Sequence, residues 1–162
     1  MERLSQVRMR YFQQENRDLV NLDECELIRS PFELSADYAV GVALDFLAEA
    51  SEQLLPEAEP NERHFRLLAA VLEHLAGRPD AVWLVVLYFT FWAVRLAGFL
   101  PELRVSRESL EIAQEVAQAP IAQMARRDWK KETAADLRRF LILQMEEHIE
   151  RRLVTVPLLE SL

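Results

Sequence analysis

Cationic side chains and one tryptophan gather in a short part of this sequence, in the run RRDWKK at 126–131 and the pair at 138–139. Lys and Arg neutralise the phosphates of a nucleic-acid backbone, and an aromatic ring offers a face on which a base can stack. We therefore predict a nucleic-acid-binding cluster with six members: Arg126, Arg127, Lys130, Lys131, Arg138 and Arg139. The alternative is an ordinary solvated helix junction, in which Asp128, Glu132 and Asp136 pair with the cations locally.

The residues that usually carry catalysis or bind metals do not form a recognisable pattern. His64, His74 and His148 belong to neither an H-E-x-x-H nor a Glu-x-x-His motif. The acids that precede two of them are adjacent in sequence, and adjacent positions of a helix do not face each other. Cys25 is the single cysteine, and three scattered glycines cannot build a phosphate loop. We expect no enzyme, no metal site and no cofactor.

The overall charge limits how nucleic acid could be bound. The formal net charge is −8, which argues against binding over the whole surface. Residues 32–100 hold ten acids and four Lys or Arg, whereas residues 126–162 hold eight Lys or Arg and seven acids. Any basic surface should therefore lie towards the C-terminus. The charged N-terminus has no apolar signal-peptide core, and with a single cysteine this predicts a cytoplasmic protein.

The stretch at 81–100, AVWLVVLYFTFWAVRLAGFL, must organise whatever surrounds these cations. It has no charged residue from Ala81 to Val94 and no polar face. A helix that is apolar all round is buried on all sides, in a protein core or in lipid. The uncharged run is shorter than the roughly 20 residues of a typical membrane span. We predict a buried central helix at 81–97, with Asp80 as its cap, and keep a membrane anchor as the alternative.

The segments before the central helix predict a hairpin and two amphipathic helices. Alternation at 4–12 indicates a strand, and the apolar run from Leu19 to Leu22 indicates a return strand. Residues 23–29 could be strand or one helical turn. Helices are predicted at 36–54 and 62–76. Ser35 and Asn61 are their expected N-caps, and Gly77 is expected to end the second helix in a left-handed conformation.

After the central helix, a stop is expected at Gly98, followed by three further helices. A helix starts at Ser106 and runs to about Gln118, and Pro120 opens a short one. A long helix to about Arg152 begins in a capping box formed by Thr133 and Asp136. The tail contains Pro157 and is predicted to be extended. The expected fold class is mainly α: a helical bundle around a buried central helix, with a small N-terminal β-hairpin.

The order of these segments resembles the C-terminal part of the DNA repair and recombination mediator RecO. Four stretches carry the resemblance: RDLVNLDECELIRSPFEL, LLPEAEPNERHFRLLAAVLEHLAG, LYFTFWAVRLAGFLPEL and LRRFLILQMEEHIERRLVTVPLL. The resemblance implies a remnant of an OB-like β fold at 1–29 and a RecO-like helical domain at 30–162. It also implies a non-enzymatic protein that binds single- or double-stranded DNA and engages RecR-like and single-stranded DNA-binding proteins, without a membrane.

Three departures from the family pattern qualify this expectation. Residues 1–22 could supply only the last strands of an OB fold. The four-Cys zinc module often found after the PEL motif is missing, because Leu103 runs almost directly into Ser106. Residues 154–156, VTV, stand where the family usually has Lys-Ser-Arg, and Leu87 and Tyr88 stand where basic residues are common. A protein-interaction scaffold without DNA binding and a membrane-associated helical protein are the alternatives.

Overall fold

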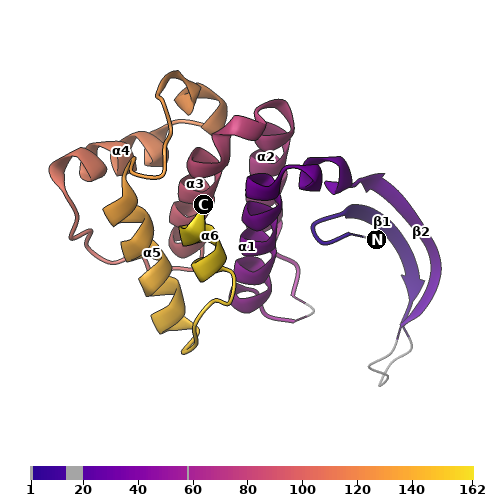
Figure 1. Cartoon of the computed structure of the whole chain (residues 1–162). Coiled ribbons are helices and arrows are strands. Elements are labelled where there is room, and N and C mark those ends of the chain that lie inside the picture. The colour runs from indigo at the N-terminus through magenta and orange to yellow at the C-terminus, as the bar shows by residue number, and fades with distance from the viewer. Residues whose placement is uncertain (1, 14–19, 58) are drawn as a thin grey trace.

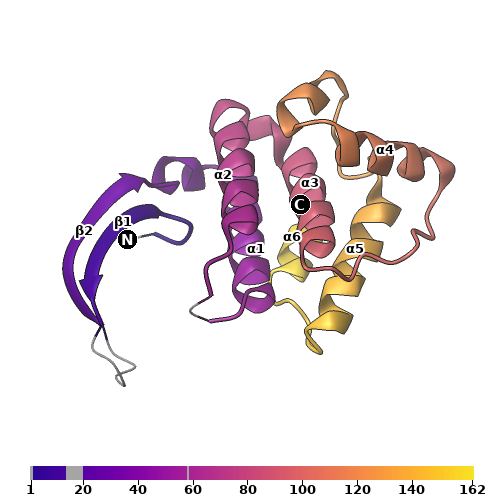
Figure 2. The same cartoon turned by 180° about the vertical axis from the view of Figure 1, so that it is seen from behind.

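Helices packed around one central helix form the body of the protein, and a curved hairpin stands at one side of it (Figures 1 and 2). The computed structural model describes residues 2–13, 20–57 and 59–162. Its elements within these residues are β1 (Gln6–Phe12), β2 (Asn21–Arg29), η1 (Phe32–Ala36), α1 (Tyr38–Leu54), α2 (Glu62–Gly77), η2 (Pro79–Ala81), α3 (Val82–Leu96), α4 (Arg107–Gln118), η3 (Ile121–Arg126), α5 (Ala135–His148) and α6 (Val156–Ser161). The mainly α prediction with an N-terminal hairpin is confirmed.

The predicted buried central helix is α3, which packs against α1, α2, α4 and α5. Eleven of its 15 residues are buried, as its lack of a polar face requires. Phe89 is fully buried, with its ring at right angles to those of Phe46 and His64, at centroid distances of 6.4 and 5.7 Å. The stretch Pro79–Leu96 is long and apolar enough to cross a membrane, but 67% of it is buried inside the protein. That burial fits a core helix.

The first two helices differ from the prediction at their ends. The N-cap of α1 is Asp37, whose carboxylate accepts a hydrogen bond from the Val40 amide at 3.1 Å. Ser35 was the wrong cap, because it lies inside η1 and donates its hydroxyl proton to the Phe32 carbonyl. Asn61 caps α2 as predicted, accepting from the His64 amide at 3.0 Å.

Two predicted signals around α3 also have different roles. Gly77 is the last residue of α2 and has no positive φ, so the prediction of a left-handed stop there was wrong. Gly98, with φ of +84°, is the glycine that takes the left-handed conformation, just beyond α3 as expected. Asp80 does not cap α3. Its carboxylate pairs with the Arg78 guanidinium of the same turn at 2.8 Å.

The long helix before the C-terminus is shorter than predicted and begins differently. Ala134, at φ of +49°, is the N-cap of α5 and supplies no side-chain cap, so the expected capping box is absent. The Asp136 carboxylate instead accepts from the Ser106 amide at 2.7 Å and from the Ser109 hydroxyl, tying α5 to the start of α4. Ser106 caps α4 as predicted, and Pro120 precedes the 3-10 helix η3.

The C-terminal segment is helical, which corrects the predicted extended tail. The chain leaves α5 after His148 and passes Glu150 at φ of +55°, so it cannot continue to Arg152 as a helix. Pro157 then lies in the first turn of α6, where its missing N–H has no helical partner to lose. The Glu49 carboxylate of α1 accepts from both the Val154 and Thr155 amides, at 2.7 and 2.9 Å. This distant acid positions α6 against the body.

The hairpin has one apolar and one charged face. The strands pair antiparallel, and 23–29 belongs to β2. On one face, Val7 lies opposite Leu27, and Tyr11 lies opposite Leu22. The other face carries two exposed ion pairs, Arg8 with Glu26 at 2.8 Å and Arg10 with Glu24 at 2.9 Å. An isolated two-stranded hairpin is marginally stable in water. A partner that covers the exposed apolar face would therefore stabilise the hairpin.

Candidate nucleic-acid interface

The first half of the predicted cationic cluster lies on the loop between η3 and α5. Arg126 ends η3 and is exposed. Arg127 donates to both oxygens of Glu115 on α4, at 3.0 and 3.1 Å. Lys130 pairs with Asp128 at 2.9 Å. Acids therefore partner two of these three cations. Asp128 is a local acid that the solvated-junction alternative named, whereas Glu115 comes from another helix.

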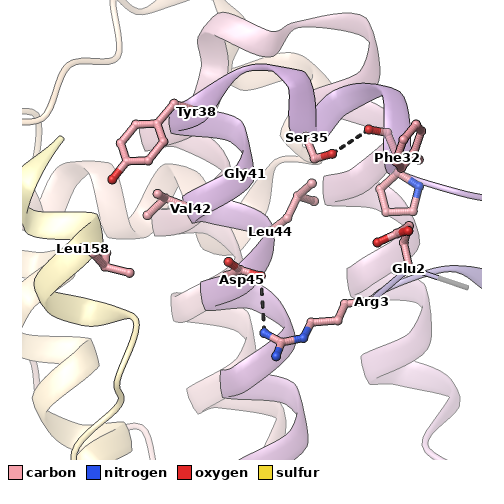
Figure 3. Close-up of a pocket in the computed structure, with 11 residues that line it drawn as sticks. Glu2, Arg3, Phe32, Ser35, Tyr38, Gly41, Val42, Leu44, Asp45 and Leu158 are labelled. Carbon is pink, nitrogen blue, oxygen red and sulfur yellow. Dashed lines mark hydrogen bonds and ion pairs between the residues drawn. The ribbon is translucent and has the colours of Figure 1, made fainter.

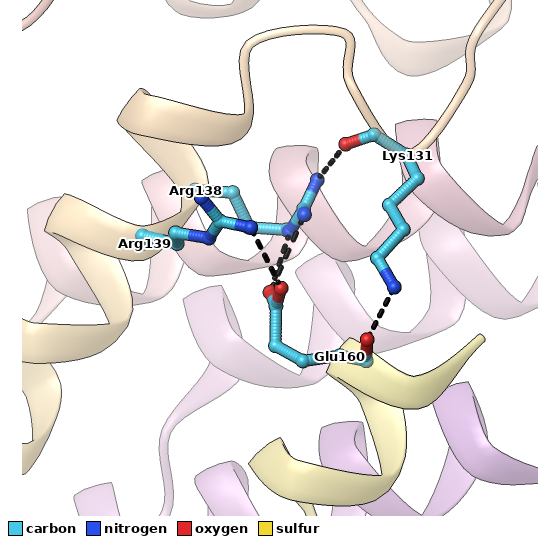
Figure 4. A network of polar contacts seen from close by, with 4 residues as sticks. All are labelled: Lys131, Arg138, Arg139 and Glu160. Atoms are coloured by element: carbon cyan, nitrogen blue, oxygen red, sulfur yellow. Dashed lines mark hydrogen bonds and ion pairs between the residues drawn. The ribbon is translucent and has the colours of Figure 1, made fainter.

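The second half of the cluster converges on one acid from the C-terminal helix (Figure 4). The Glu160 carboxylate accepts from the Arg138 guanidinium at 3.3 and 3.4 Å and from Arg139 at 3.2 Å. Lys131 donates its ammonium proton to the Glu160 backbone carbonyl. Nothing in the local spacing near 126–139 indicated Glu160, because it lies more than 20 residues further along the chain.

Arg138 is a buried residue, with 1% of its surface exposed. Its guanidinium also donates to the Lys131 carbonyl at 2.8 Å and lies 4.4 Å from the centre of the Trp83 ring. Burial lowers the pKa of Arg138 below its ordinary value, and the charge of Glu160 partly offsets this. Arg138 thus lies beneath the cationic surface, and its charge is not exposed to solvent.

The tryptophan of the RRDWKK run does not offer a free stacking face. Trp129 is 9% exposed, and its indole N–H donates to the Met124 carbonyl at 2.9 Å. The Arg127 guanidinium lies 5.9 Å from the centre of the Trp129 ring. Trp83 of α3 is a second aromatic beside the cluster, with the Lys131 ammonium 5.9 Å from its ring centre. Sequence reasoning assigned Trp83 to the core, and the structure leaves it only half-buried. Its position beside Arg138 could not be read from spacing, because it depends on the packing of α3 against α5.

A buried serine–histidine pair lies inside the helical body but cannot act as a catalytic pair. His64 Nε2 lies 2.9 Å from the Ser51 hydroxyl, and both residues are buried. The Ser51 hydroxyl donates its proton to the Leu47 carbonyl at 2.7 Å. The Ser51 hydroxyl must therefore accept a hydrogen bond from His64 Nε2–H. A ring nitrogen that already carries a proton cannot remove the proton of the serine. Burial lowers the pKa of His64, which favours the neutral ring in the fold.

A groove of about 450 Å³ opens beside α1 and α6 (Figure 3). It lies between the N-terminal segment, the start of α1 and Leu158 of α6. Phe32 and Tyr38 line it with 64% and 68% of their surfaces exposed, and Arg3 pairs with Asp45 across it at 3.4 Å.

Within the described residues, no group of three His, Cys, Asp or Glu could hold a metal ion.

These features define a helical domain with a β-hairpin, a paired cationic surface and an exposed apolar strand face. Residues 35–106 match the family described as recombination protein O C terminal. The chain is 36% identical over 196 aligned positions to the DNA repair protein RecO of Koribacter versatilis, covering 100% of this chain and 80% of that protein. The chain belongs to the RecO family.

Two further relatives match a smaller part of this chain. The DNA repair protein RecO of Prosthecochloris aestuarii is 32% identical over 70% of this chain and 44% of its own length. The protein of the same name from Pelotomaculum thermopropionicum is 37% identical over 60% of this chain and 37% of its own length. No solved structure matches the chain at a comparable level.

Proposed function

We propose that this chain is a non-enzymatic mediator in DNA repair and recombination, acting in the cytoplasm on single- or double-stranded DNA. The observation that carries the proposal is the 36% identity to a DNA repair protein RecO along the whole chain, hairpin and helical body together. In this proposal residues 1–29 are the remnant of an OB-like fold, and residues 30–162 form the RecO-like helical domain.

The contact with DNA is assigned to the five cations of the cluster that reach solvent: Arg126, Arg127, Lys130, Lys131 and Arg139. Arg126 makes no ion pair among the described residues and can meet a phosphate directly. Arg127, Lys130 and Arg139 must each exchange a carboxylate for a phosphate. Each exchange offsets part of the gain from releasing counterions. The proposed binding is therefore weak at physiological salt and strong at low salt.

Charge reversal tests this assignment. The variant carries Arg126→Glu, Arg127→Glu and Lys130→Glu, and binding to fluorescent single- and double-stranded oligonucleotides is measured by anisotropy at several salt concentrations. Binding should be lost at low salt. A second variant replaces the same three residues by Gln. The slope of log affinity against log salt concentration should become shallower by about 0.7–0.9 for each phosphate contact that is lost.

The matched control reverses three exposed cations elsewhere, Arg63, Arg66 and Arg107, and should retain most of the affinity. Thermal melting of both variants confirms that the fold is intact. Equal affinity in the cluster variant and the control would contradict the assignment of DNA binding to this surface.

A second function is favoured by the apolar face of the hairpin. Met9, Tyr11, Leu22 and Leu27 are each more than half exposed, at 54%, 56%, 55% and 55%. Contiguous exposed apolar surface marks a contact with another protein, and main-chain groups at the strand edges can add to such a contact. We propose that this face receives a recombination partner, of which RecR-like and single-stranded DNA-binding proteins are the candidates. In a pure interaction scaffold this face alone would carry the function.

A further inference from the structure

We propose that α6 is a self-inhibitory strap, which uses Glu160 to occupy a site for single-stranded DNA made by Lys131, Arg138, Arg139 and Trp83. The inference rests on the proposed function, because it names a ligand site and a control within the same cationic surface. The site takes one phosphate on its cations and one unpaired base on the indole.

The contacts of Glu160 are those that a bound phosphate would make. Its two carboxylate oxygens divide between Arg138 and Arg139, at 3.2 to 3.4 Å, and its backbone carbonyl takes the Lys131 ammonium group (Figure 4). Arginine guanidinium groups bind carboxylates and phosphates with the same planar fork. A phosphate that replaces Glu160 therefore finds its donors already oriented.

The aromatic part of the site lies directly beside these donors. The Arg138 guanidinium is 4.4 Å, and the Lys131 ammonium 5.9 Å, from the centre of the Trp83 ring. Trp83 is half-buried and packs at the edge of the core. Cations next to a partly exposed aromatic ring suit a single strand, whose bases can turn towards a ring, better than a duplex, whose bases are stacked within it.

The strap is attached lightly enough to move. α6 has six residues and buries one side chain completely, Leu159. A helix this short has little stability of its own and depends on its tertiary contacts. Its start is held by Glu49 through the Thr155 amide and hydroxyl, at 2.9 and 2.6 Å. Displacing Glu160 can thus lift the last turn while Glu49 retains the segment.

The burial of Arg138 couples the two states. With 1% of its surface exposed, Arg138 keeps its charge in the closed state because Glu160 and the Lys131 carbonyl receive its protons. A buried charge that loses its counter-charge is strongly unfavourable. Loss of the Glu160 charge therefore favours the open state, in which water or a phosphate solvates Arg138.

The test compares Glu160→Gln with Glu132→Gln. Glu132 is an exposed acid beside Lys131 whose carboxylate makes none of the ion pairs described above, so its substitution changes the net charge equally. Affinity for a fluorescent oligo-dT strand and for a duplex is measured by anisotropy on the full chain at low salt. Glu160→Gln should bind the single strand about fivefold more tightly than Glu132→Gln, the value of one ion pair, with a smaller gain for the duplex.

Hydrogen exchange gives a second readout that does not depend on net charge. Amides of residues 158–162 should exchange faster in Glu160→Gln than in Glu132→Gln, and faster in the unaltered protein when oligo-dT is added. The proposal is overturned if the two variants bind the single strand equally, or if oligo-dT protects these amides. Equal binding by both variants, in a protein whose affinity is still lost on charge reversal at 126, 127 and 130, would reject the strap and leave the proposed function standing.

Discussion

At the scale of single residues, charged side chains divide into those that meet solvent and those that hold the fold. Arg126 and Arg138 look alike in sequence, yet one is exposed and the other is buried beneath α6. The difference arises because Arg138 lies on the face of α5 that packs beside Trp83, while Arg126 ends a surface turn. A cation-rich run thus predicts where charge is located in the chain, and packing decides which charges a ligand can reach.

His64 gives a pH prediction at the same scale. Burial lowers the pKa of His64 below the ordinary value of 6.5, so the unfolded chain takes up its proton first. The contribution of neutral His64 to stability is complete above pH 6.5 and is lost as the pH falls below it. Urea unfolding at pH 5 to 8 should show this loss, and His64→Leu should reduce it.

A control separates His64 from a second histidine in the same pH window. The pKa of His74 is also lowered, by burial and by the Arg78 charge. His74→Gln should therefore retain the part of the acid destabilisation that belongs to His64. An identical pH profile for His64→Leu and the unaltered protein would contradict the role given to the buried imidazole.

At the scale of elements, two glycines test how helices end. Gly77 lies in helical geometry with open space around its Cβ position, so Gly77→Ala should stabilise the fold by about 0.5–1 kcal/mol. Gly98 has equal space but a φ of +84°, so Gly98→Ala should cost about 1–2 kcal/mol. Urea unfolding midpoints measure both effects. Shifts of the same sign would show that the two helix ends do not differ in backbone conformation.

At the scale of the whole molecule, the hairpin and the helical body make few contacts. Leu4 packs at the edge of the core, and Arg3 pairs with Asp45 at 3.4 Å. A chain that begins at Ser30 should therefore unfold cooperatively, with a midpoint close to that of the full chain, while losing any partner held by the apolar hairpin face. Calorimetry and titration with RecR-like and single-stranded DNA-binding proteins measure the two effects. Loss of cooperative unfolding would show that residues 1–29 belong to the same folding unit.

Local patterns predicted most of the elements, and failed mainly where an element ends. The all-apolar run of α3, the alternation of β1 and the caps Asn61 and Ser106 were readable because each depends on neighbours a few residues away. The tail was wrongly predicted to be extended because it contains a proline. Proline breaks the interior of a helix but is tolerated in the first turn, where Pro157 lies. The end of α5 was misread because Glu146, which accepts from the Leu153 amide, draws the chain back after the helix.

The sequence by itself determined that this chain is a helical bundle around an apolar helix, because hydrophobic periodicity is a local property of the chain. It also determined where the cations are concentrated. Only the tertiary structure decided what those cations face. Glu160 meets Arg138 and Arg139 from more than 20 residues away, and Glu49 reaches the Thr155 amide from more than 100. Such pairings follow from how α1, α5 and α6 pack, since no periodicity records which charge a folded chain will place beside another.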